Sequence, residues 1–321
     1  MMSDSITNLR SPATISPFDL TDERAYQCWR EWKLSDYPGT AEDLIVSVAN
    51  PCRLSPAEKQ ALLSRCQKAN AAIYRISTGD FADKELVGSL GHQFGLVRLD
   101  RNLRADEDSI TSLKVVSGTG GAYYIPYTNR PLNWHTDGYY NTPGEQVRGV
   151  VLHCVSAAAE GGENVYLDHE IAYLLLRDEN PDYLAALMQP DAMTIPANTE
   201  AGVEIRPTQS GPVFSVEPRT GSLHMRYTAR TRSIAWKNDR DIRMAVGFLT
   251  ELLAGESDFL FRYRLQPGEG ILCNNILHKR EAFADDPAGG RTRLLYRARY
   301  HDRIRGTELN TIWSGVRPCS G

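Results

Sequence analysis

The chain has 321 residues, of which 41% are hydrophobic and 24% are charged, as in an ordinary soluble globular protein. Its formal net charge of −4, without any block of basic residues, disfavours nucleic acid as the main partner. No apolar run approaches the roughly 18 residues that a membrane-spanning helix needs. Residues 1–10 also lack the apolar core of a signal peptide, and the six cysteines show no CxxC spacing. We therefore expect a cytoplasmic protein that contacts neither nucleic acid nor a membrane.

The first third of the chain predicts an arm followed by helices. Residues 1–20 are rich in Ser, Thr, Asn and Pro, which is typical of an extended or partly ordered segment. Residues 21–36 and 55–75 have helical patterns. In the second, Ser55 is the expected N-cap and is followed by a proline in the first helical position. Residues 80–91 predict a further helix.

Short strands follow, and they are predicted by β-branched and apolar residues between glycines and prolines. They cover residues 95–99, 110–116, 147–155, 203–206, 212–217, 222–227, 259–265, 270–274 and 292–300. Helical patterns at 168–189 and 240–253 interrupt them. The glycine-rich segment 118–121 lacks the GxxxxGK[ST] pattern of a phosphate loop, so we interpret it as a turn.

This order of elements predicts a mainly β protein with helical additions. The typical length of a domain would divide the chain into two domains, but single barrels and sandwiches with insertions are often longer than a typical domain. We therefore expect one elaborated domain over residues 21–302, preceded by the arm at 1–20 and followed by an irregular tail at 303–321. No repeat of fixed period is visible, which excludes solenoids and propellers.

Two potential metal ligands lie two residues apart in the segment Trp134–Tyr139. On a strand, side chains at i and i+2 leave the same face, so His135 and Asp137 would point to one place. A histidine from a distant strand would complete a 2-His-1-carboxylate set, which binds Fe(II) and leaves coordination positions open. His278 is our candidate, because it follows the apolar, strand-like run at 270–273.

Other histidines compete for this role. A lone His-x-Asp pattern often occurs by chance, so the wider context has to support a metal site. His224 is the main rival for the third ligand, since residues 223–226 also have a strand-like pattern. It lacks the Asn-Asn-Ile-Leu-His setting of His278 and the arginines that follow it, so we favour His278. We interpret the remaining histidines as packed, structural or surface residues: His92, His153, His169 and His301.

Several blocks of sequence supply that context, because their order and approximate spacing agree with a known enzyme family. The blocks are Tyr124–Asn129, Leu132–Asp137, Leu152–Cys154, Gly161–Asn164, His278–Phe283 and Arg293–Arg297. Over roughly residues 85–301 the chain resembles the taurine dioxygenase/clavaminate synthase superfamily, including its γ-butyrobetaine hydroxylase branch. The resemblance implies an Fe(II)- and 2-oxoglutarate-dependent oxygenase. It also implies a double-stranded β-helix (jelly-roll) core, which we expect to be flanked by an N-terminal helical layer and a helical insert.

The same resemblance implies how the co-substrate is held. In the family, 2-oxoglutarate chelates the metal and reacts with O2, with release of succinate and CO2. Arg293, which lies 15 residues after His278, matches the arginine that binds the far carboxylate, and its planar fork suits that group. Arg291 shares the predicted strand face and is a weaker competitor; a solvated outer strand is the alternative. Asn164 stands where the family usually has a threonine that binds the same carboxylate, and whether the amide replaces it stays open.

The prime substrate is the least determined feature. Arg297 is four residues beyond Arg293, and in the resembling enzymes an arginine at this place faces the primary substrate. We therefore expect a small polar metabolite that is anionic or amino-acid-like. Arg226 and Tyr227 are predicted to add polar contacts, and Tyr140 to close the pocket. The alternative is that Arg297 pairs with an acidic side chain and only holds the barrel together.

These patterns favour a hydroxylase of a small molecule. A desaturase or cyclase of the same superfamily is the runner-up, because clavaminate synthase-like members divert the same oxidant. The rival from another class is a catalytically silent β-helix protein that binds a metal or ligand without turnover. Release of succinate would separate an enzyme from such a protein. The sequence leaves open whether the chain forms a homo-oligomer.

Overall fold

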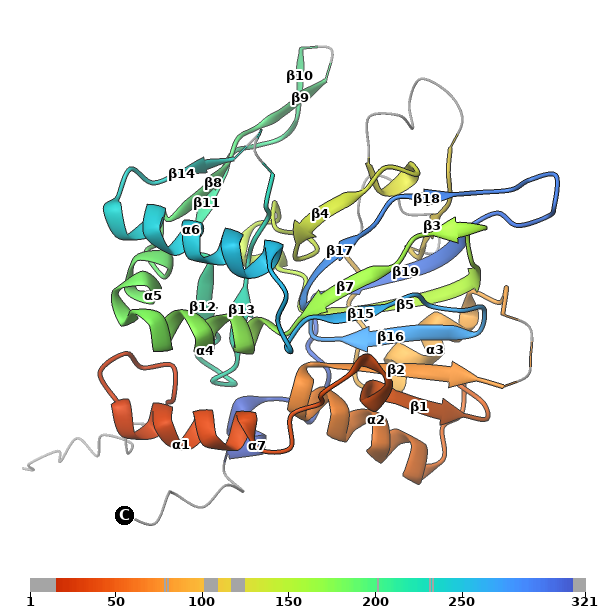
Figure 1. Ribbon diagram of the computed structural model, residues 1–321, viewed down its shortest axis with the longest axis horizontal. Helices are drawn as coiled ribbons and strands as arrows, with labels where there is room; N and C mark the ends of the chain where they lie inside the picture. The colour runs from red at the N-terminus through yellow and green to blue at the C-terminus, as the bar shows by residue number, and fades with distance from the viewer. Residues whose placement is uncertain are drawn as a thin grey trace, which may run out of the picture.

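Two β-sheets of different size contain the strands that position the candidate ligands (Figure 1). The computed structural model describes residues 16–77, 79, 81–100, 109–116, 125–200, 202–230, 232 and 234–313. Within these residues the architecture is mainly β with helical additions, as expected. No described helix combines the length and apolar character that crossing a bilayer would require.

The larger sheet has the strand order β1-β2-β16-β5-β19-β3. Its strands are β1 (Ile45–Val48), β2 (Ala71–Ile76), β16 (Glu269–Cys273), β5 (Gly149–Ser156), β19 (Leu294–Tyr300) and β3 (Thr111–Leu113). Only β1 and β2 pair in parallel; the other neighbours are antiparallel. Helices α2 (Pro56–Ala69) and α3 (Glu85–Gln93) pack on one face, where Leu62 and Leu90 join a buried cluster with Val151 of the sheet. The N-terminal helices therefore form a layer over this sheet.

The smaller sheet has the strand order β15-β7-β17-β4, and all its pairs are antiparallel. Its strands are β15 (Phe261–Tyr263), β7 (Asn164–Leu167), β17 (Leu277–Arg280) and β4 (Leu132–His135). Tyr166 and Phe261 share a buried cluster with Ile271 and Leu295 of the larger sheet. The two sheets therefore face each other across an apolar core.

A second helical layer covers the other side of the smaller sheet. It consists of α1 (Glu23–Leu34), α4 (His169–Glu179), α5 (Pro181–Leu187) and α6 (Arg240–Ala254). Leu167 and Leu277 of the sheet belong to the same buried cluster as residues of α1, α4 and α6. Lys33 is fully buried, and its ammonium lies 2.6 Å from carboxylate oxygens of both Asp168 and Glu170. This ion-pair group fixes α1 to the beginning of α4.

The remaining elements are short connections. They are η1 (Ala41–Leu44), η2 (Ile125–Tyr127), η3 (Pro143–Glu145), β6 (Glu160–Gly161), β8 (Met193–Ile195), β9 (Asn198–Glu200), β10 (Val203–Arg206), β11 (Gln209–Gly211), β12 (Phe214–Val216), β13 (Leu223–Met225), β14 (Ala235–Trp236), β18 (Phe283–Ala284) and α7 (Leu309–Trp313). The β9–β10 hairpin projects from the body at the top of Figure 1.

Two predicted helices end earlier than their sequence patterns suggested. The helix predicted at 55–75 stops at Ala69, because Asn70 takes the left-handed conformation and the chain continues into β2. Ser55 does cap this helix, in a capping box with Glu58. The helix predicted at 168–189 is two helices, since a proline at the start of α5 has no N–H with which to continue α4.

Other predictions changed in extent. The strand predicted at 95–99 contributes only an isolated bridge between Leu99 and Tyr300. The predicted turn at 118–121 lies outside the described residues. The tail expected to be irregular after residue 302 contains α7, whose Leu309 is buried.

The N-terminal segment and the cysteines also differ from expectation. Phe18, within the predicted arm, is 2% exposed and packs edge-on against Trp29 at 5.1 Å. The arm therefore joins the core before residue 20. Cys28 is disulfide-bonded, whereas the sequence had led us to expect a cytoplasmic protein. The other described cysteines are free.

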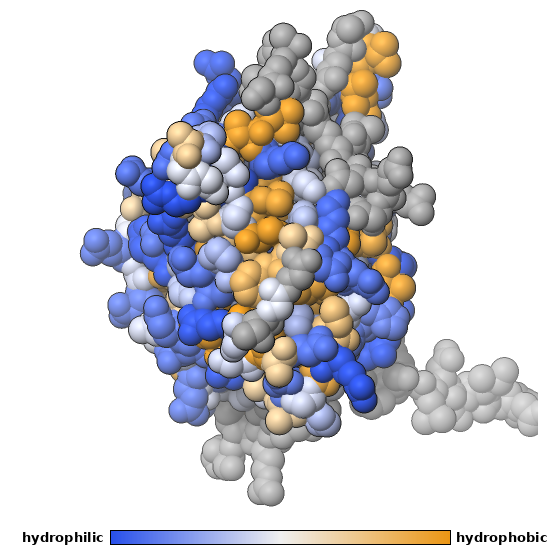
Figure 2. Space-filling view, turned by 90° about the vertical axis from the view of Figure 1, so that its right-hand side faces the viewer, coloured by the Kyte–Doolittle hydropathy of each residue, from blue (hydrophilic) through white to orange (hydrophobic). Residues whose placement is uncertain are grey.

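One face of the molecule exposes apolar side chains in a band through its middle (Figure 2). Polar side chains line both margins of this band. The large apolar side chains that are exposed in the described residues are Val97, Val115, Val116, Val203, Ile205 and Met244. Val203 and Ile205 belong to β10, so the projecting hairpin carries apolar as well as charged residues.

Candidate metal centre and co-substrate pocket

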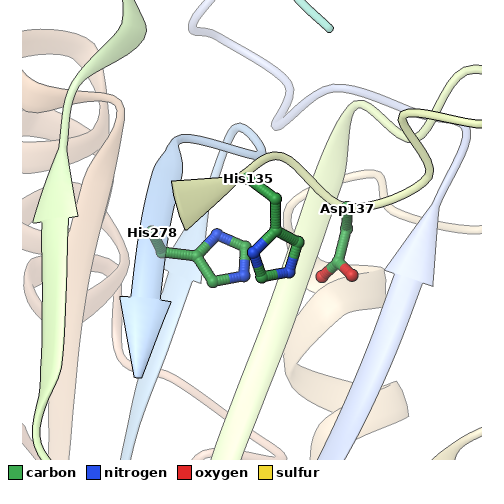
Figure 3. Close-up of side chains that lie close together, drawn as sticks. All are labelled: His135, Asp137 and His278. Carbon is green, nitrogen blue, oxygen red and sulfur yellow. The ribbon is translucent and has the colours of Figure 1, made fainter. Parts of the chain in front are cut away.

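His135, Asp137 and His278 converge on one point, as the sequence predicted (Figure 3). The register of β17 against β4 places His278 directly opposite His135, and their rings are 4.3 Å apart. Asp137 follows β4 by two residues, immediately before a glycine with φ of +66° that turns the chain. One ligand atom from each residue lies within 4.8 Å of the others. His224 lies on β13, opposite Ser215, and is not in this group.

The two histidines are oriented by backbone carbonyl groups. Nδ1 of His135 lies 2.8 Å from the carbonyl oxygen of Asn133, and Nδ1 of His278 lies 3.0 Å from that of Ile276. These acceptors assign the hydrogen to Nδ1 and leave Nε2 with a free lone pair. Burial, reinforced by the charge of His278, lowers the pKa of His135 to about 3. His135 is therefore a neutral imidazole, the form that binds a metal.

Asp137 presents one oxygen to arginines and keeps the other free. Its Oδ1 accepts a hydrogen bond from Nη1 of Arg297 at 2.9 Å and lies 3.6 Å from Nη1 of Arg299. Burial alone would raise the pKa of Asp137, but these two guanidinium groups hold it well below its ordinary value. Oδ2 is buried and has no hydrogen-bond partner among the described residues. Such an orphaned oxygen beside two free imidazole nitrogens fits a divalent cation, and this donor set is the one that suits Fe(II).

Asn275 is a further residue of the centre whose role the sequence did not reveal. Its Oδ1 accepts from the backbone N–H of Asp137 at 2.8 Å, and its Nδ2 donates to the Asp137 carbonyl at 2.9 Å. Nδ2 also lies 2.6 Å from the carbonyl oxygen of Val147. The residue is buried and has a φ of +50°, a conformation that asparagine tolerates better than most side chains. Its position three residues before His278 was the only available signal.

Arg293 is a buried cation that lacks an anionic partner. It is 6% exposed, and its guanidinium makes no hydrogen bond or ion pair with the described residues. It lies over the ring of Phe283 at 5.0 Å, and Arg280 lies over the same ring at 4.9 Å. Burial lowers the pKa of Arg293 to about 10. Burial and the charge of Arg293 lower the pKa of Arg280 to about 9. Because an unpaired buried charge is costly, this place favours a bound anion.

The competing arginine has a different environment. Arg291 forms a surface ion pair with Asp286 at 3.0 Å, and 62% of its side chain is exposed. Its charge is therefore already matched and solvated, unlike that of Arg293. This difference favours Arg293 as the cation for the far carboxylate of 2-oxoglutarate.

The Gly161-Gly162 turn brings β7 close to Arg293. Both glycines have positive φ, and a Cβ added to Gly162 would lie 3.6 Å from Nε of Arg293. Asn164 begins β7 and is buried, opposite Arg280 in the sheet register. Its side-chain amide makes no hydrogen bond within the described part of the chain. A role for this amide in carboxylate binding therefore stays a prediction.

Of the predicted substrate contacts, Arg297 and Tyr140 lie beside the centre. Arg297 is buried and forms an ion pair with Asp137. From the sequence, pairing with an acidic side chain was the alternative to substrate binding, but here that side chain is a candidate metal ligand. Nε of Arg297 is buried and has no hydrogen-bond partner in the part of the chain that the structure describes. The hydroxyl of Tyr140 accepts from Nη1 of Arg299 at 3.1 Å, and its ring contacts that of Tyr139 at 5.1 Å. A substrate contact of either residue remains a prediction.

Arg226 and Tyr227 have mainly structural surroundings. The guanidinium of Arg226 donates to four backbone carbonyls at 2.7–3.2 Å, which belong to Tyr139, Met193, Gly211 and Gln209. Tyr227 belongs to the largest buried cluster, with its ring 6.3 Å from that of Trp236. Burial raises the pKa of Tyr227 to about 12. Neither residue makes a side-chain contact with the three candidate ligands among the contacts found in the described residues.

Comparison with known proteins agrees with this geometry. Residues 41–299 match the family model described as taurine catabolism dioxygenase TauD, TfdA family. A uridine-5′-phosphate dioxygenase from an Amycolatopsis species is 31% identical over 180 residues, which cover 54% of this chain and 62% of that protein. A second uridine-5′-phosphate dioxygenase, from a Streptomyces species, is 29% identical over 203 residues and covers 61% of this chain and 71% of its own length.

Solved structures share the fold at low sequence identity. An asparagine oxygenase in complex with Fe(II), a 3-hydroxyasparagine and succinate has a TM-score of 0.54 and 17% identity, over 76% of this chain and 79% of its own. A taurine dioxygenase from Burkholderia xenovorans has the same TM-score, 0.54, and 17% identity, over 82% of this chain and 89% of its own. The family model covers most of the chain and includes all three converging ligands. The chain belongs to the TauD/TfdA family.

Proposed function

We propose that the enzyme uses Fe(II), 2-oxoglutarate and O2 to hydroxylate a nucleoside 5′-monophosphate, with uridine 5′-phosphate as the first candidate. Two relatives that carry this substrate in their names support the choice, although the chain spans only 62% of the first of them. A nucleotide also meets the expectation of a small anionic metabolite. We assign the two facing sheets to the double-stranded β-helix core of this family.

One observation carries the metal and co-substrate part of the proposal. The orphaned Oδ2 of Asp137 and the free Nε2 atoms of His135 and His278 offer a cation three donors on one side. The unpaired guanidinium of Arg293 offers an anion a buried partner. A site that needs both a cation and an anion fits Fe(II) together with a dicarboxylate.

The chain's own residues then have distinct tasks. Fe(II) with 2-oxoglutarate and O2 supplies the oxidant that removes hydrogen from a substrate carbon, while succinate and CO2 are released. Arg293 holds the far carboxylate, and Asn164 is placed to donate a second hydrogen bond to it. Arg297 occupies Oδ1 of Asp137, so that Oδ2 is left for the metal, and its unpartnered Nε is available to a substrate anion. The apolar cluster between the sheets keeps water from the co-substrate end.

The test is substrate-dependent release of succinate. Protein loaded anaerobically with Fe(II) and 2-oxoglutarate is mixed with O2 and a panel of uridine 5′-phosphate, other nucleoside monophosphates, uridine and anionic amino acids. We expect uridine 5′-phosphate to stimulate succinate formation most strongly and to gain one oxygen atom. His135→Ala is the inactive control. If iron and 2-oxoglutarate bind but only an amino acid stimulates turnover, the substrate assignment is wrong.

A further inference from the structure

A series of aromatic contacts links the metal ligands to the β9–β10 hairpin. The ring of Tyr139 lies 6.4 Å from that of His135, and the ring of Tyr140 lies 5.1 Å from that of Tyr139. The guanidinium carbon of Arg206, the last residue of β10, lies 5.5 Å from the centre of the Tyr140 ring. The base of the projecting hairpin therefore borders the approach to the candidate metal centre.

Tyr140 is held in place from the side of the metal centre. Its hydroxyl accepts a hydrogen bond from Nη1 of Arg299 at 3.1 Å. Arg299 is itself buried, forms an ion pair with Asp100 and lies 3.6 Å from Oδ1 of Asp137. The Tyr140 ring is therefore a fixed surface between the metal ligands and Arg206.

Arg230 reaches the same place from another segment. Thr228 forms a β-bridge with His135, and the N–H of Ala229 donates to the Trp134 carbonyl at 2.8 Å. Arg230 is the next residue and is exposed. Burial lowers the pKa of Arg206, and the charge of Arg230 adds to this effect. Arg230 thus lies near Arg206 and directly follows the segment that pairs with His135.

Arg206 and Arg230 have no acidic partners within the described residues. Arg206 donates to the carbonyls of Pro207 at 3.2 Å and Pro196 at 2.9 Å, which leaves its charge unmatched. Arg226 adds a third charge nearby: burial and the proximity of Arg206 lower its pKa to about 10. Arg226 donates only to backbone carbonyls, and no ion pair involves Arg206 or Arg230 in the part of the chain that the structure describes. Arginines gathered without carboxylates favour an anion with more than one negative charge.

We propose that Arg206 and Arg230 form the subsite for the phosphate group of the prime substrate, with the Tyr140 ring as its floor. The proposal rests on the proposed function, since it places the nucleotide's anionic end at the mouth of that same site. A phosphate offers several acceptor oxygens to two guanidinium forks, which a single carboxylate cannot fill equally well. Arg226 does not bind the anion directly, because its donors are already used by the backbone.

The experiment compares ligands that differ only by the phosphate. Binding of uridine 5′-phosphate and of uridine is measured by calorimetry on the anaerobic Fe(II)–2-oxoglutarate protein. Arg206→Gln and Arg230→Gln should each raise the Kd of uridine 5′-phosphate about fivefold or more, because each removes a charge-assisted hydrogen bond. The Kd values of uridine and of 2-oxoglutarate should change by less than about twofold, since neither ligand uses this subsite.

Arg219→Gln is the matched control. It removes the same charge from the turn between β12 and β13, where 83% of the Arg219 side chain is exposed. This variant should bind uridine 5′-phosphate like the wild type. Arg206→Lys should recover only part of the lost affinity, because lysine keeps the charge but loses the planar fork.

Two results separate failure of the subsite from failure of the proposed function. If uridine 5′-phosphate is bound and oxidised but both glutamine variants bind it normally, the subsite is wrong and the function stands. If the wild type does not bind uridine 5′-phosphate, the nucleotide assignment fails, and sulfate becomes the probe of the subsite. Sulfate should then raise the Tm of the wild type above that in chloride of equal ionic strength, and the Arg206→Gln/Arg230→Gln variant should lose this rise. An equal rise in both, or none in the wild type, overturns the subsite.

Discussion

The side-chain amide of Asn275 hydrogen-bonds both backbone polar groups of Asp137, accepting from its N–H at 2.8 Å and donating to its carbonyl at 2.9 Å. Asn275 precedes His278 by three residues, so this contact joins the two segments that supply the candidate metal ligands. Because Asp137 lies beyond the end of β4, no strand pairing fixes its backbone. Asn275 therefore positions Asp137 without being one of the three candidate ligands.

Asn275→Gly should weaken Fe(II) binding about tenfold or more while the protein remains folded. The glycine accepts the φ of +50°, so the loss reports the missing amide rather than backbone strain. Each lost buried hydrogen bond costs roughly 1 kcal/mol, so the free energy of unfolding should fall by about 2–3 kcal/mol. Anaerobic Fe(II) titration and chemical denaturation measure the two effects. Unchanged iron affinity in a destabilised variant would show that Asn275 serves only the fold.

Replacing any of the three candidate ligands should abolish tight Fe(II) binding. His135→Ala, Asp137→Ala and His278→Ala each remove a donor that no described neighbour can replace. His224→Ala is the control, because that histidine lies on β13, away from the centre. Metal content after anaerobic reconstitution distinguishes them. A site emptied by His224→Ala and retained in His278→Ala would refute the ligand assignment.

Arg293→Leu should raise the concentration of 2-oxoglutarate needed to saturate the Fe(II) protein by roughly tenfold or more, since a charge-assisted hydrogen bond contributes about 1.5–3 kcal/mol. Bidentate chelation of Fe(II) by 2-oxoglutarate gives a weak visible charge-transfer band, which serves as the readout under anaerobic conditions. Arg291→Leu should leave the titration unchanged, because that arginine is exposed and paired with Asp286. Equal effects of the two substitutions would contradict the assignment of Arg293.

Substitutions of Arg297 should separate its two contacts. Arg297→Lys keeps a charge beside Asp137, so Fe(II) affinity should be largely retained, but the KM of the prime substrate should rise because the fork is lost. Arg297→Ala should lower the affinity for Fe(II) and also raise the KM of the prime substrate. The reason is that Oδ1 of Asp137 then keeps only Arg299 as a neighbour, at 3.6 Å. Affinity for 2-oxoglutarate should change little in either variant. A substrate KM that is unaffected by lysine would leave Arg297 with a purely structural role.

The buried group around Lys33 predicts a pH-dependent stability. Burial would raise the pKa of Glu170, but the charges of Lys33, His169 and Arg303 and the hydrogen bond from Lys33 together outweigh it and lower the pKa to about 2. A carboxyl whose pKa is lowered on folding stabilises the protein above its unfolded pKa of 4.5, and this stabilisation is lost as the pH falls through the folded value. Glu170→Gln should therefore lower the free energy of unfolding at neutral pH, by at most about 3 kcal/mol because Asp168 still pairs with Lys33. Urea denaturation should show the difference from wild type shrinking between pH 4.5 and about 2. A difference independent of pH would contradict the ion-pair account.

The sequence by itself determined which three residues form the candidate metal centre and the general class of the fold. His135 and Asp137 are two residues apart, so local backbone geometry brings them together, and the setting of His278 distinguished it from His224. The family resemblance pointed to Arg293, 15 residues after His278, and its role in binding the co-substrate stays a prediction. Helix α2 was predictable at its start because Ser55 and Glu58 form a local cap. Its end was not, because the chain there joins β2 in a sheet with strands from distant parts of the sequence.

Only the tertiary structure decided which arginines and tyrosines are available to a ligand. Arg226 and Arg206 look alike in sequence, yet the first donates to four carbonyls from three separate segments, and the second keeps an unmatched charge beside Tyr140. Tyr227 is enclosed by core residues, whereas Tyr140 is held beside the metal centre by Arg299. The physical reason is that hydrogen bonding and burial depend on neighbours brought together from distant parts of the chain. Residue type and local periodicity do not show which distant residues become neighbours in the folded chain.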